Sequence, residues 1–445
     1  MAIIWLSISV VLIIVGTSKF DIHPILALLL AALLFGLGTG MDPVLLIDTI
    51  NSGFGSTIGS IGLVIIAGLV IGAFLEHSGG AIALSESILK LIGKNRIHSA
   101  MGIMGYVVSI PVFADSGFII LSSLNKVLSR KAGISIAGTT VALSLGLMAT
   151  HTMVPPTPGP IAAAGIIEAD LGLVIVCGLV ASIFALWVGI HFAKYIGAKL
   201  EIPLEEQFVH QSPSNDPKIP ATPKAWHSIL PIIIPIVLII LKSLRDLPSA
   251  PFADSIFSSI IGFIGLPVPA LIVGMLISFS LPSKFDPKNL GPRGWVGKAM
   301  TSGAIIILIT GAGGAFGKVL QQSDLSTLLE SSLSSLSLGI WLPYLIAMGL
   351  KTAQGSSTVS IVTTASIISP LLASMGLQSD IDLALTVVAI GAGAAGVSHA
   401  NDSFFWVVTQ LSGLDVGQGY RTHSIGTLLL GFSAMIVLSI IHYCS

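Results

Sequence analysis

Charged residues are scarce in this sequence of 445 residues. Lys and Arg number 20 and Asp and Glu 21, so 9% of the chain is charged, against about 25% in an ordinary soluble domain. Hydrophobic residues make up 53%, and the mean hydropathy is +0.97. A soluble globule of this size cannot hide so much apolar surface from water. The composition therefore excludes a soluble enzyme and predicts a chain whose solvent is lipid.

An excess of positive charge, a cysteine framework and common catalytic motifs are also missing. The formal net charge is −1, which excludes the basic surface of a nucleic-acid-binding protein. Cys177 and Cys444 stand far apart and belong to no metal or redox motif. The chain has no Walker A loop, no His-Glu-x-x-His helix and no Gly-x-Ser-x-Gly elbow. We therefore predict no enzyme, no ATP-driven pump, no metal site and no cofactor.

Long apolar runs are what the sequence has instead. Eight uninterrupted runs have about the length of a membrane span: 2–18, 22–39, 57–76, 171–193, 226–241, 266–281, 299–317 and 424–443. Three further apolar regions, 97–125, 132–166 and 338–413, are broken by clusters of Gly, Pro, Ser, Thr and His. Region 97–125 has basic residues at both ends, and it is too short to cross twice, which takes about 40 residues. We therefore predict an all-α polytopic membrane protein with about 11–14 transmembrane segments, re-entrant hairpins and broken helices.

The chain divides into two similar halves. The polar stretch 197–225 separates an N-terminal repeat, 1–196, from a C-terminal repeat, 226–445. Gly72, Leu75 and Ser78 recur as Gly317, Leu320 and Ser323, about 245 residues later, and the breaks recur at a similar offset. The distribution of basic residues predicts that the second half has the opposite orientation in the membrane. Lys242 and Arg245 depart from this pattern, because they fall on the predicted outer side. Inverted repeats with broken helices indicate the binding site of a secondary transporter.

The four breaks hold the candidate functional residues. A carboxylate at membrane depth is costly unless it is paired or protonated, so Asp115 in the first break and Asp402 in the fourth are functional candidates. His151 precedes four prolines that end a helix, and His399 lies close to Asp402. The third break, Gln354 to Ser360, presents hydroxyls at the start of a helix, which can hold a carboxylate or Na⁺. Lys351 can pair with the substrate or with a protein carboxylate, or extend to the membrane surface.

At these breaks the sequence resembles the gluconate:proton symporter, or GntP-type, permease family within the ion transporter superfamily. The resemblance rests on Thr150-His151, Val154-Pro155-Pro156, Pro158-Gly159-Pro160, Gly355-Ser356, Thr358-Val359, Ser398-His399, Asn401-Asp402 and Phe405-Trp406. It implies a bacterial plasma (inner) membrane protein, a small organic anion as substrate, and an elevator-like homodimer. Three departures touch the expected site: Asp115 stands for a family Glu, Thr157 for a second His and Lys351 for an Arg. The substrate therefore need not be gluconate.

We expect import of gluconate or a related small hydroxy-carboxylate by proton symport. Alternatives are sodium coupling, a D-serine, glycerate or hydroxybutyrate permease of the same family, and a passive anion channel. The proton-coupling candidates are Asp115, His399 and Asp402, and Lys351 is their charge partner. The predicted substrate-binding residues are Asp115, Ser116, Gly117, Thr150, His151, Thr152, Pro155, Pro156, Gly355, Ser356, Ser357, Thr358 and Asn401.

Overall fold

The computed structural model describes residues 2–20, 22–93, 96–200, 222–246, 256–323, 338–400 and 402–444. Within these ranges every regular element is a helix and no strand is present, which confirms the predicted all-α class. The first half contains α1 (Ala2–Ser18), α2 (Pro24–Gly38), α3 (Pro43–His77), α4 (Gly80–Ile92), α5 (Ile97–Val108), α6 (Ala114–Ala132), α7 (Ile136–Met153), α8 (Pro158–Ile167), α9 (Leu171–Tyr195) and η2 (Gly197–Lys199). The second half contains α10 (Ala225–Asp246), α11 (Ile256–Ile264), α12 (Pro267–Ser278), η4 (Pro287–Leu290), α13 (Trp295–Gln321), α15 (Trp341–Gln354), α16 (Ser357–Ile368), η5 (Ser369–Leu371), α17 (Asp380–Ala395), α18 (Ser403–Ser412), α19 (Val416–Gly419), η6 (Tyr420–Ser424) and α20 (Ile425–Cys444).

The starts of these helices follow from local sequence. Proline occupies the first turn of α2, α3, α8 and α12, where a missing N–H leaves no helical bond unmade. Asp42 and Asp170 cap α3 and α9, and their carboxylates accept hydrogen bonds of 2.9–3.0 Å from first-turn N–H groups. A bilayer offers no water to unpaired backbone groups, so helices that satisfy their own backbone are the unit expected in lipid.

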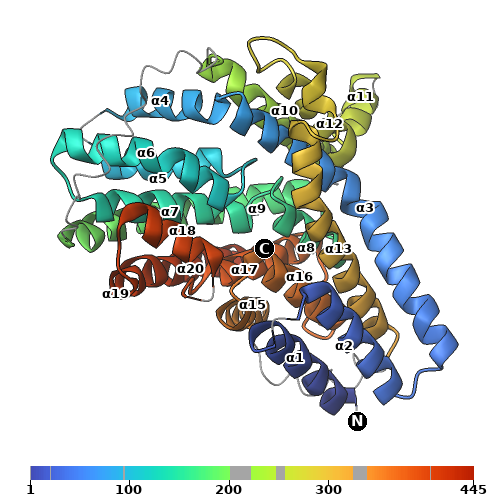
Figure 1. Cartoon of the computed structure of the whole chain (residues 1–445). Helices are drawn as coiled ribbons and strands as arrows, with labels where there is room; N and C mark the ends of the chain where they lie inside the picture. The colour runs from blue at the N-terminus through green and yellow to red at the C-terminus, as the bar shows by residue number, and fades with distance from the viewer. Residues whose placement is uncertain are drawn as a thin grey trace.

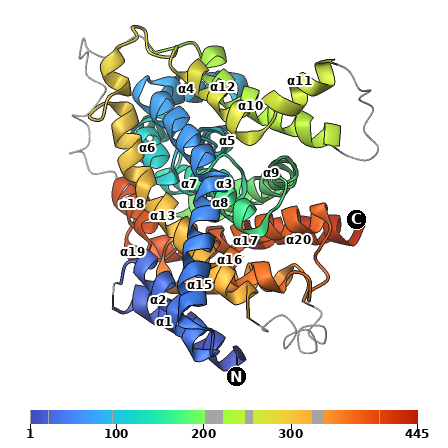
Figure 2. The same ribbon diagram turned by 90° about the vertical axis from the view of Figure 1, so that its right-hand side faces the viewer.

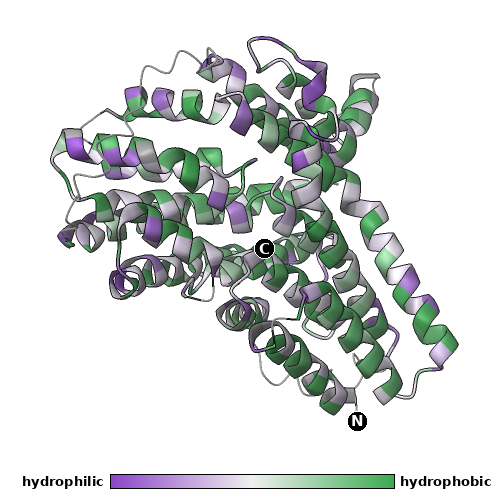
Figure 3. Ribbon diagram, in the orientation of Figure 1, coloured by the Kyte–Doolittle hydropathy of each residue, from purple (hydrophilic) through white to green (hydrophobic). Residues whose placement is uncertain are grey.

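Several of the helices can cross a membrane. By length and composition five described helices qualify, and seven when each of two bent pairs counts as one span. Large apolar side chains such as Leu26, Trp187 and Ile440 are exposed on the outside, and apolar segments run along most helices (Figure 3). Such a surface suits contact with lipid, so the polytopic class is confirmed, while the total of 11–14 segments stays a prediction.

α3 and α13 pack lengthwise against each other along one edge of the molecule (Figure 1). Glycines bring the two backbones close: a Cβ atom on Gly314 would lie 2.0 Å from Thr57 Oγ1, and one on Gly53 would lie 2.7 Å from the Gly314 carbonyl oxygen. α1 and α2 lie near one end of this pair, and α10, α11 and α12 lie near the other (Figure 2). The pair therefore forms a long support beside the interrupted helices.

Four interrupted segments make up the centre of the fold. Residues 109–113 separate α5 from α6, and residues 154–157 separate α7 from α8. In the second half, residues 355–356 separate α15 from α16, and residues 396–402 separate α17 from α18. A hairpin followed by a broken helix thus occurs once in each half, in the predicted order. The inverted relation of the halves stays a prediction, as does the division at 197–225, because residues 201–221 lie outside the described ranges.

Lys242 and Arg245, which depart from the predicted charge pattern, lie in a cluster of ion pairs. The Lys242 ammonium is 2.8 Å from Asp246 and 3.9 Å from Asp170, and the Arg245 guanidinium is 3.1 Å from Asp246. The contact places Lys242 on the same side of the protein as Asp170, and the outer location of this side stays a prediction. Asp170 and Asp246 thus offset the two positive charges locally.

Candidate functional site

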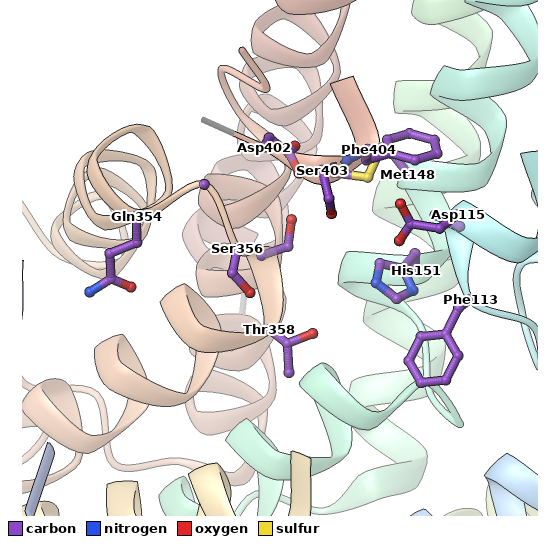
Figure 4. A pocket seen from close by; sticks show the side chains of 13 residues that line it. Phe113, Asp115, Met148, His151, Gln354, Ser356, Thr358, Asp402, Ser403 and Phe404 are labelled. Atoms are coloured by element: carbon purple, nitrogen blue, oxygen red, sulfur yellow. Dashed lines mark hydrogen bonds between the residues drawn. The ribbon is translucent and has the colours of Figure 1, made fainter. Parts of the chain in front are cut away.

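The four interrupted segments meet around one cavity of about 270 Å³. Figure 4 shows Asp115 and His151 on one wall, with Ser356 and Thr358 across from them. Each of the four breaks, or a helix turn next to it, contributes to the lining, which consists of Phe113, Ala114, Asp115, Met148, His151, Gln354, Gly355, Ser356, Ser357, Thr358, Asp402, Ser403 and Phe404. Residues more than 280 positions apart in the sequence therefore form one site.

The first break places Asp115 at the start of α6. Pro111 cannot continue α5, and the Ser109 hydroxyl closes the turn by donating to the Val112 carbonyl oxygen at 3.1 Å. Asp115 lies in the first turn of α6, where the helix dipole favours a negative charge. Its Oδ1 atom is buried and has no hydrogen-bond partner among the described residues. The Asp115 carboxylate is directed toward the cavity (Figure 4).

Ser116 and Gly117 follow Asp115 but are not part of the cavity lining. A Cβ atom on Gly117 would lie 2.7 Å from Leu147 Cδ2. Gly117 therefore lets α6 approach α7 closely, and it packs against α7 behind the cavity lining.

The second break places His151 in the last turn of α7. Its Nδ1 atom is buried without a hydrogen-bond partner among the described residues, and its ring lies 5.9 Å from the Phe113 ring. The neighbouring hydroxyls are engaged elsewhere: Thr150 donates to the Tyr106 carbonyl oxygen at 2.9 Å, and Thr152 donates to the Met148 carbonyl oxygen at 3.0 Å. Of these three side chains, His151 alone lines the cavity.

Pro155 and Pro156 lie behind the cavity wall. They are joined by a cis peptide bond and are buried, but they do not line the cavity. The Pro156 carbonyl oxygen lies 3.0 Å from where a Cβ atom on Gly68 would be. The two prolines thus end α7 and bring the break against α3.

The third break turns α15 into α16 with two residues. Gly355 ends α15 with φ +78°, a left-handed conformation that glycine adopts without the penalty of a Cβ atom. Ser356 caps α16, and its Oγ accepts from the Val359 N–H at 3.3 Å. Ser357 and Thr358 occupy the first turn, whose N–H groups have no partner within the helix. The cavity is therefore lined here by hydroxyls and by the positive end of a helix dipole.

The fourth break ends in a buried ion pair. The Lys351 ammonium lies 2.6 Å from Asp402 Oδ2, and the two side chains are 1% and 5% exposed. Lys351 also donates to the Gly355 carbonyl oxygen at 2.7 Å. Asp402 caps α18, because its Oδ1 accepts from the Phe404 N–H at 3.1 Å. The pair therefore ties the tip of the second hairpin to the fourth break.

His399 and Asn401 complete the set of predicted residues. The His399 ring is outside the cavity lining, and its Nε2–H donates to the Thr352 carbonyl oxygen at 2.8 Å. This bond links the fourth break to α15. Asn401 lies outside the described residues, so its predicted part in binding stays a prediction.

Sequence analysis did not select several residues that surround the site. Met148 lies one turn before His151 on α7, and this spacing places the two on one helix face. Phe113, Ser403 and Phe404 adjoin predicted residues along the chain. Gln354, which is predicted at the tip of the second hairpin, also lines the cavity. Both of its amide atoms are buried without a partner among the described residues, and the amide points away from the Asp115 wall (Figure 4).

The cavity is suited to a small anion with polar groups. The ion pair largely cancels its own charge, which leaves the α16 terminus, the serine and threonine hydroxyls, Asp115 and His151 for a ligand. No group of three or more His, Cys, Asp or Glu side chains in the described part of the chain could hold a metal ion. The groups available to a ligand are therefore side chains and a helix terminus.

Comparison with known proteins agrees with this geometry. The family model described as GntP family permease matches residues 1–444 of this chain. A gluconate permease of Pseudomonas aeruginosa is 30% identical and the match covers 97% of this chain and 95% of that protein. The D-serine transporter DsdX of Escherichia coli (strain K12) is 30% identical, with 97% and 96% covered. The YdaH transporter of Alcanivorax borkumensis shares the fold, with a TM-score of 0.68, 14% identity, and 95% and 98% of the chains covered.

These matches confirm the resemblance found in the sequence. The family matches almost from end to end, and both relatives have nearly the same length as this chain. The chain therefore belongs to the GntP permease family, and it is a multi-pass transporter of the plasma membrane and not an enzyme.

Proposed function

We propose that this chain imports gluconate or a related small hydroxy-carboxylate in symport with protons. The observation that carries the proposal is the cavity where two hairpin tips and two broken helices meet, with polar atoms of Asp115 and His151 in its wall that have no partner among the described residues. Irregular backbone at membrane depth is tolerated where it lines a cavity, and such cavities are the binding sites of secondary transporters. Relatives named as gluconate and D-serine transporters support a hydroxylated carboxylate as the substrate class.

The substrate carboxylate binds at the tip of the second hairpin. Gly355, Ser356, Ser357 and Thr358 line this part of the cavity, and the first-turn N–H groups of α16 are free of intrahelical bonds. The helix terminus adds a favourable field for a negative charge. Lys351 lies behind the tip, where its ammonium is bonded to Asp402 and to the Gly355 carbonyl oxygen, so Asp402 offsets its charge.

The other polar side chains of the cavity wall form hydrogen bonds with the substrate hydroxyls. Asp115 Oδ1 and His151 Nδ1 are buried atoms without partners among the described residues, so a substrate hydroxyl would satisfy them. The hydroxyls of Thr150 and Thr152 already bond backbone carbonyls. We therefore keep His151 and Asn401 from the predicted hydroxyl-binding set of Thr150, His151 and Asn401, and we assign Asp115 to it in place of Thr150. The remaining predicted residues adjoin the cavity but do not line it, and we assign them to supporting its wall: Ser116, Gly117, Thr150, Thr152, Pro155 and Pro156.

Charge balance supports coupling to protons. Lys351 and Asp402 offset each other, so an anionic substrate would leave the buried site with a net negative charge, and an ionised Asp115 would add a second. Each uncompensated buried charge costs on the order of several kcal/mol. A proton taken up with the substrate removes this cost, and Asp115 and Asp402 are the acidic groups of the cavity wall. His399, the third predicted candidate, bonds the Thr352 carbonyl oxygen behind the wall.

The larger architecture is part of the same proposal. We assign the repeats to residues 1–196 and 226–445, joined by 197–225, and relate them by inverted topology. The recurrence of a hairpin and a broken helix in each half supports this assignment. A homodimer is proposed from the family resemblance.

Uptake into proteoliposomes tests the function. Labelled gluconate is supplied under an imposed inward proton gradient, with glycerate, D-serine and hydroxybutyrate as competitors and then as labelled substrates. We expect uphill uptake that an uncoupler abolishes. Uptake that requires Na⁺ instead would replace the coupling ion, and flux that never exceeds equilibrium would indicate a passive channel. Failure to transport any of the four acids would reject the substrate class.

A further inference from the structure

His423 is a fully buried histidine that lies outside the cavity lining. It belongs to η6, a π-helical turn between α19 and α20, and such turns occur frequently at functional sites. Its ring nitrogens both contact hydroxyls: Nδ1 is 3.1 Å from Ser144 Oγ on α7, and Nε2 is 3.1 Å from Ser398 Oγ in the fourth break. The ring therefore bridges two of the segments that form the cavity.

Ser398 connects this histidine to the buried ion pair. Its Oγ lies 2.5 Å from Asp402 Oδ2, and the same oxygen accepts from the Lys351 ammonium at 2.6 Å. Backbone contacts hold the serine in place, because its N–H donates to Thr427 Oγ1 at 3.1 Å and its carbonyl accepts from the Ser424 hydroxyl. His423, Ser398, Asp402 and Lys351 thus form a continuous series that ends at the cavity.

Counting hydrogens shows that this series can hold one additional proton without losing a contact. With a neutral ring, the Nε2–H donates to Ser398, the Ser398 hydroxyl donates to Asp402, and the Ser144 hydroxyl donates to Nδ1. With one more proton, the Nδ1–H donates to Ser144 Oγ. The Ser144 hydroxyl then donates to the Val141 carbonyl oxygen, which lies 3.0 Å away. The change requires rotation of one hydroxyl hydrogen.

The additional proton can also reside on Asp402. In that arrangement the protonated carboxyl donates to Ser398 Oγ, and the Ser398 hydroxyl donates to His423 Nε2. Ser398 converts one arrangement into the other by accepting one hydrogen and releasing its own, so that an O–H bond on Asp402 breaks as an N–H bond on Nε2 forms. We propose that His423 and Asp402 share the transported proton through Ser398, which makes His423 the proton acceptor farthest from the cavity.

The charges around the series suit this assignment. In the part of the chain that the structure describes, Asp402 and Lys351 are the charged groups that act on His423, and they offset each other as an ion pair. The additional proton therefore gives the series one net positive charge beside the hairpin tip, and this charge balances one substrate carboxylate. The other neighbours are uncharged or lie at the surface: the Phe404 and Phe405 rings, Ser144 on α7, exposed Asp415 at the start of α19, and exposed Tyr420 and Arg421 in η6.

The inference about His423 rests on the proposed proton symport. Counterflow exchange and proton-driven accumulation together distinguish failure of the inference from failure of the proposed function. His423→Gln keeps a donor and an acceptor but cannot carry the proton. In proteoliposomes we expect this variant to exchange labelled gluconate in counterflow within about twofold of the wild-type rate, while uphill accumulation driven by a proton gradient falls to the equilibrium level. If D-serine, glycerate or hydroxybutyrate is the acid that wild type accumulates, the same assay uses that acid. His191→Gln, at an exposed histidine on α9 that bonds the Trp187 carbonyl, is the matched control.

The possible outcomes test the proposed function and the role of His423 separately. Absence of proton-driven uptake by wild type rejects the proposed function and this inference together. Wild-type-like accumulation by His423→Gln, with normal wild-type coupling, rejects the inference alone. If His423→Gln loses counterflow as well, Ser398→Ala and Ser144→Ala replace it, because they alter the partners of the ring and keep the ring itself. We expect Ser398→Ala to uncouple uptake and Ser144→Ala to shift its pH profile; unchanged coupling and pH profile in both would overturn the proposal.

Discussion

Lys351 and Asp402 are a lysine and an aspartate almost completely removed from solvent. Their side chains are 1% and 5% exposed, and the ammonium and carboxylate are 2.6 Å apart. Removing two charges from water is costly, and their mutual attraction and additional hydrogen bonds offset that cost only in good geometry. Here Ser398 and the Phe404 N–H bind the carboxylate and the Gly355 carbonyl binds the ammonium. The pair therefore needs both members.

Replacing one member should expose this dependence. We expect Lys351→Met to destabilise the purified protein by about 3–5 kcal/mol, because Asp402 is then a buried charge without its partner. Adding Asp402→Asn should restore part of this stability but not transport. Unfolding of the detergent-solubilised protein measures the effect, with Lys288→Met at an exposed position as the control. Losses that simply add in the double variant would contradict the coupling of the two residues.

Asp115 should act as a protonated hydrogen-bonding group when the substrate is bound. Asparagine has nearly the same shape and can donate from the same place, so we expect Asp115→Asn to bind gluconate within about threefold of wild type. Asp115→Ala removes the group, and a lost hydrogen bond of about 0.5–1.5 kcal/mol corresponds to roughly two- to tenfold weaker binding. Equilibrium binding at fixed pH measures both. Equal losses in the two variants would mean that the ionised carboxylate is required.

At the scale of helices, glycines set how closely α5 and α7 approach. A Cβ atom on Gly146 of α7 would lie 2.0 Å from the Gly102 carbonyl oxygen and 3.0 Å from the Tyr106 nitrogen of α5. Thr150 bonds the Tyr106 carbonyl in the same interface. α5 leads to the break that is followed by Asp115, and α7 carries His151 in its last turn. The distance between these two helices therefore controls how the two side chains face each other.

Gly146→Ala should separate the two helices. Overpacking of a tight contact costs about 1–3 kcal/mol, and we expect transport to fall more than stability does, because both cavity residues move. Gly349→Ala is the control, since a Cβ atom at this exposed position in α15 would meet nothing within 4 Å and alanine favours helix by up to about 1 kcal/mol. Uptake rate and melting temperature are measured on both. Wild-type uptake by Gly146→Ala would show that the close contact is dispensable.

The helices and their breaks could be predicted because they depend on local sequence. Apolar runs specify the spans, and proline and glycine clusters specify where helices stop, so the observed breaks fall inside the predicted stretches. The direction of a side chain depends on tertiary contacts that no local pattern contains. The Thr150 hydroxyl bonds a carbonyl 44 residues earlier, and His423 contacts Ser144, which is 279 residues away. For that reason the sequence indicated His399 as a titratable neighbour of Asp402 and did not indicate His423.

For the whole molecule, the relation between the two halves determines how the cavity can open to either side. Each half contributes one hairpin and one broken helix to the same cavity. If the halves have inverted topology, the two hairpins enter the membrane from opposite sides, and small movements could expose the cavity alternately. The charge pattern assigns the flanks of the first hairpin to the inside and those of the second to the outside.

Cysteine labelling tests this inversion directly. Cys177→Ala and Cys444→Ser remove the native thiols, and single cysteines then replace exposed Arg130, at the end of α6, or exposed Gln378, before α17. On sealed right-side-out vesicles, a membrane-impermeant maleimide should label Gln378→Cys at once and Arg130→Cys only after permeabilisation. The expected difference follows because the two positions flank different hairpins. Labelling of both variants from the same side would mean that the hairpins enter together and that the repeats are not inverted.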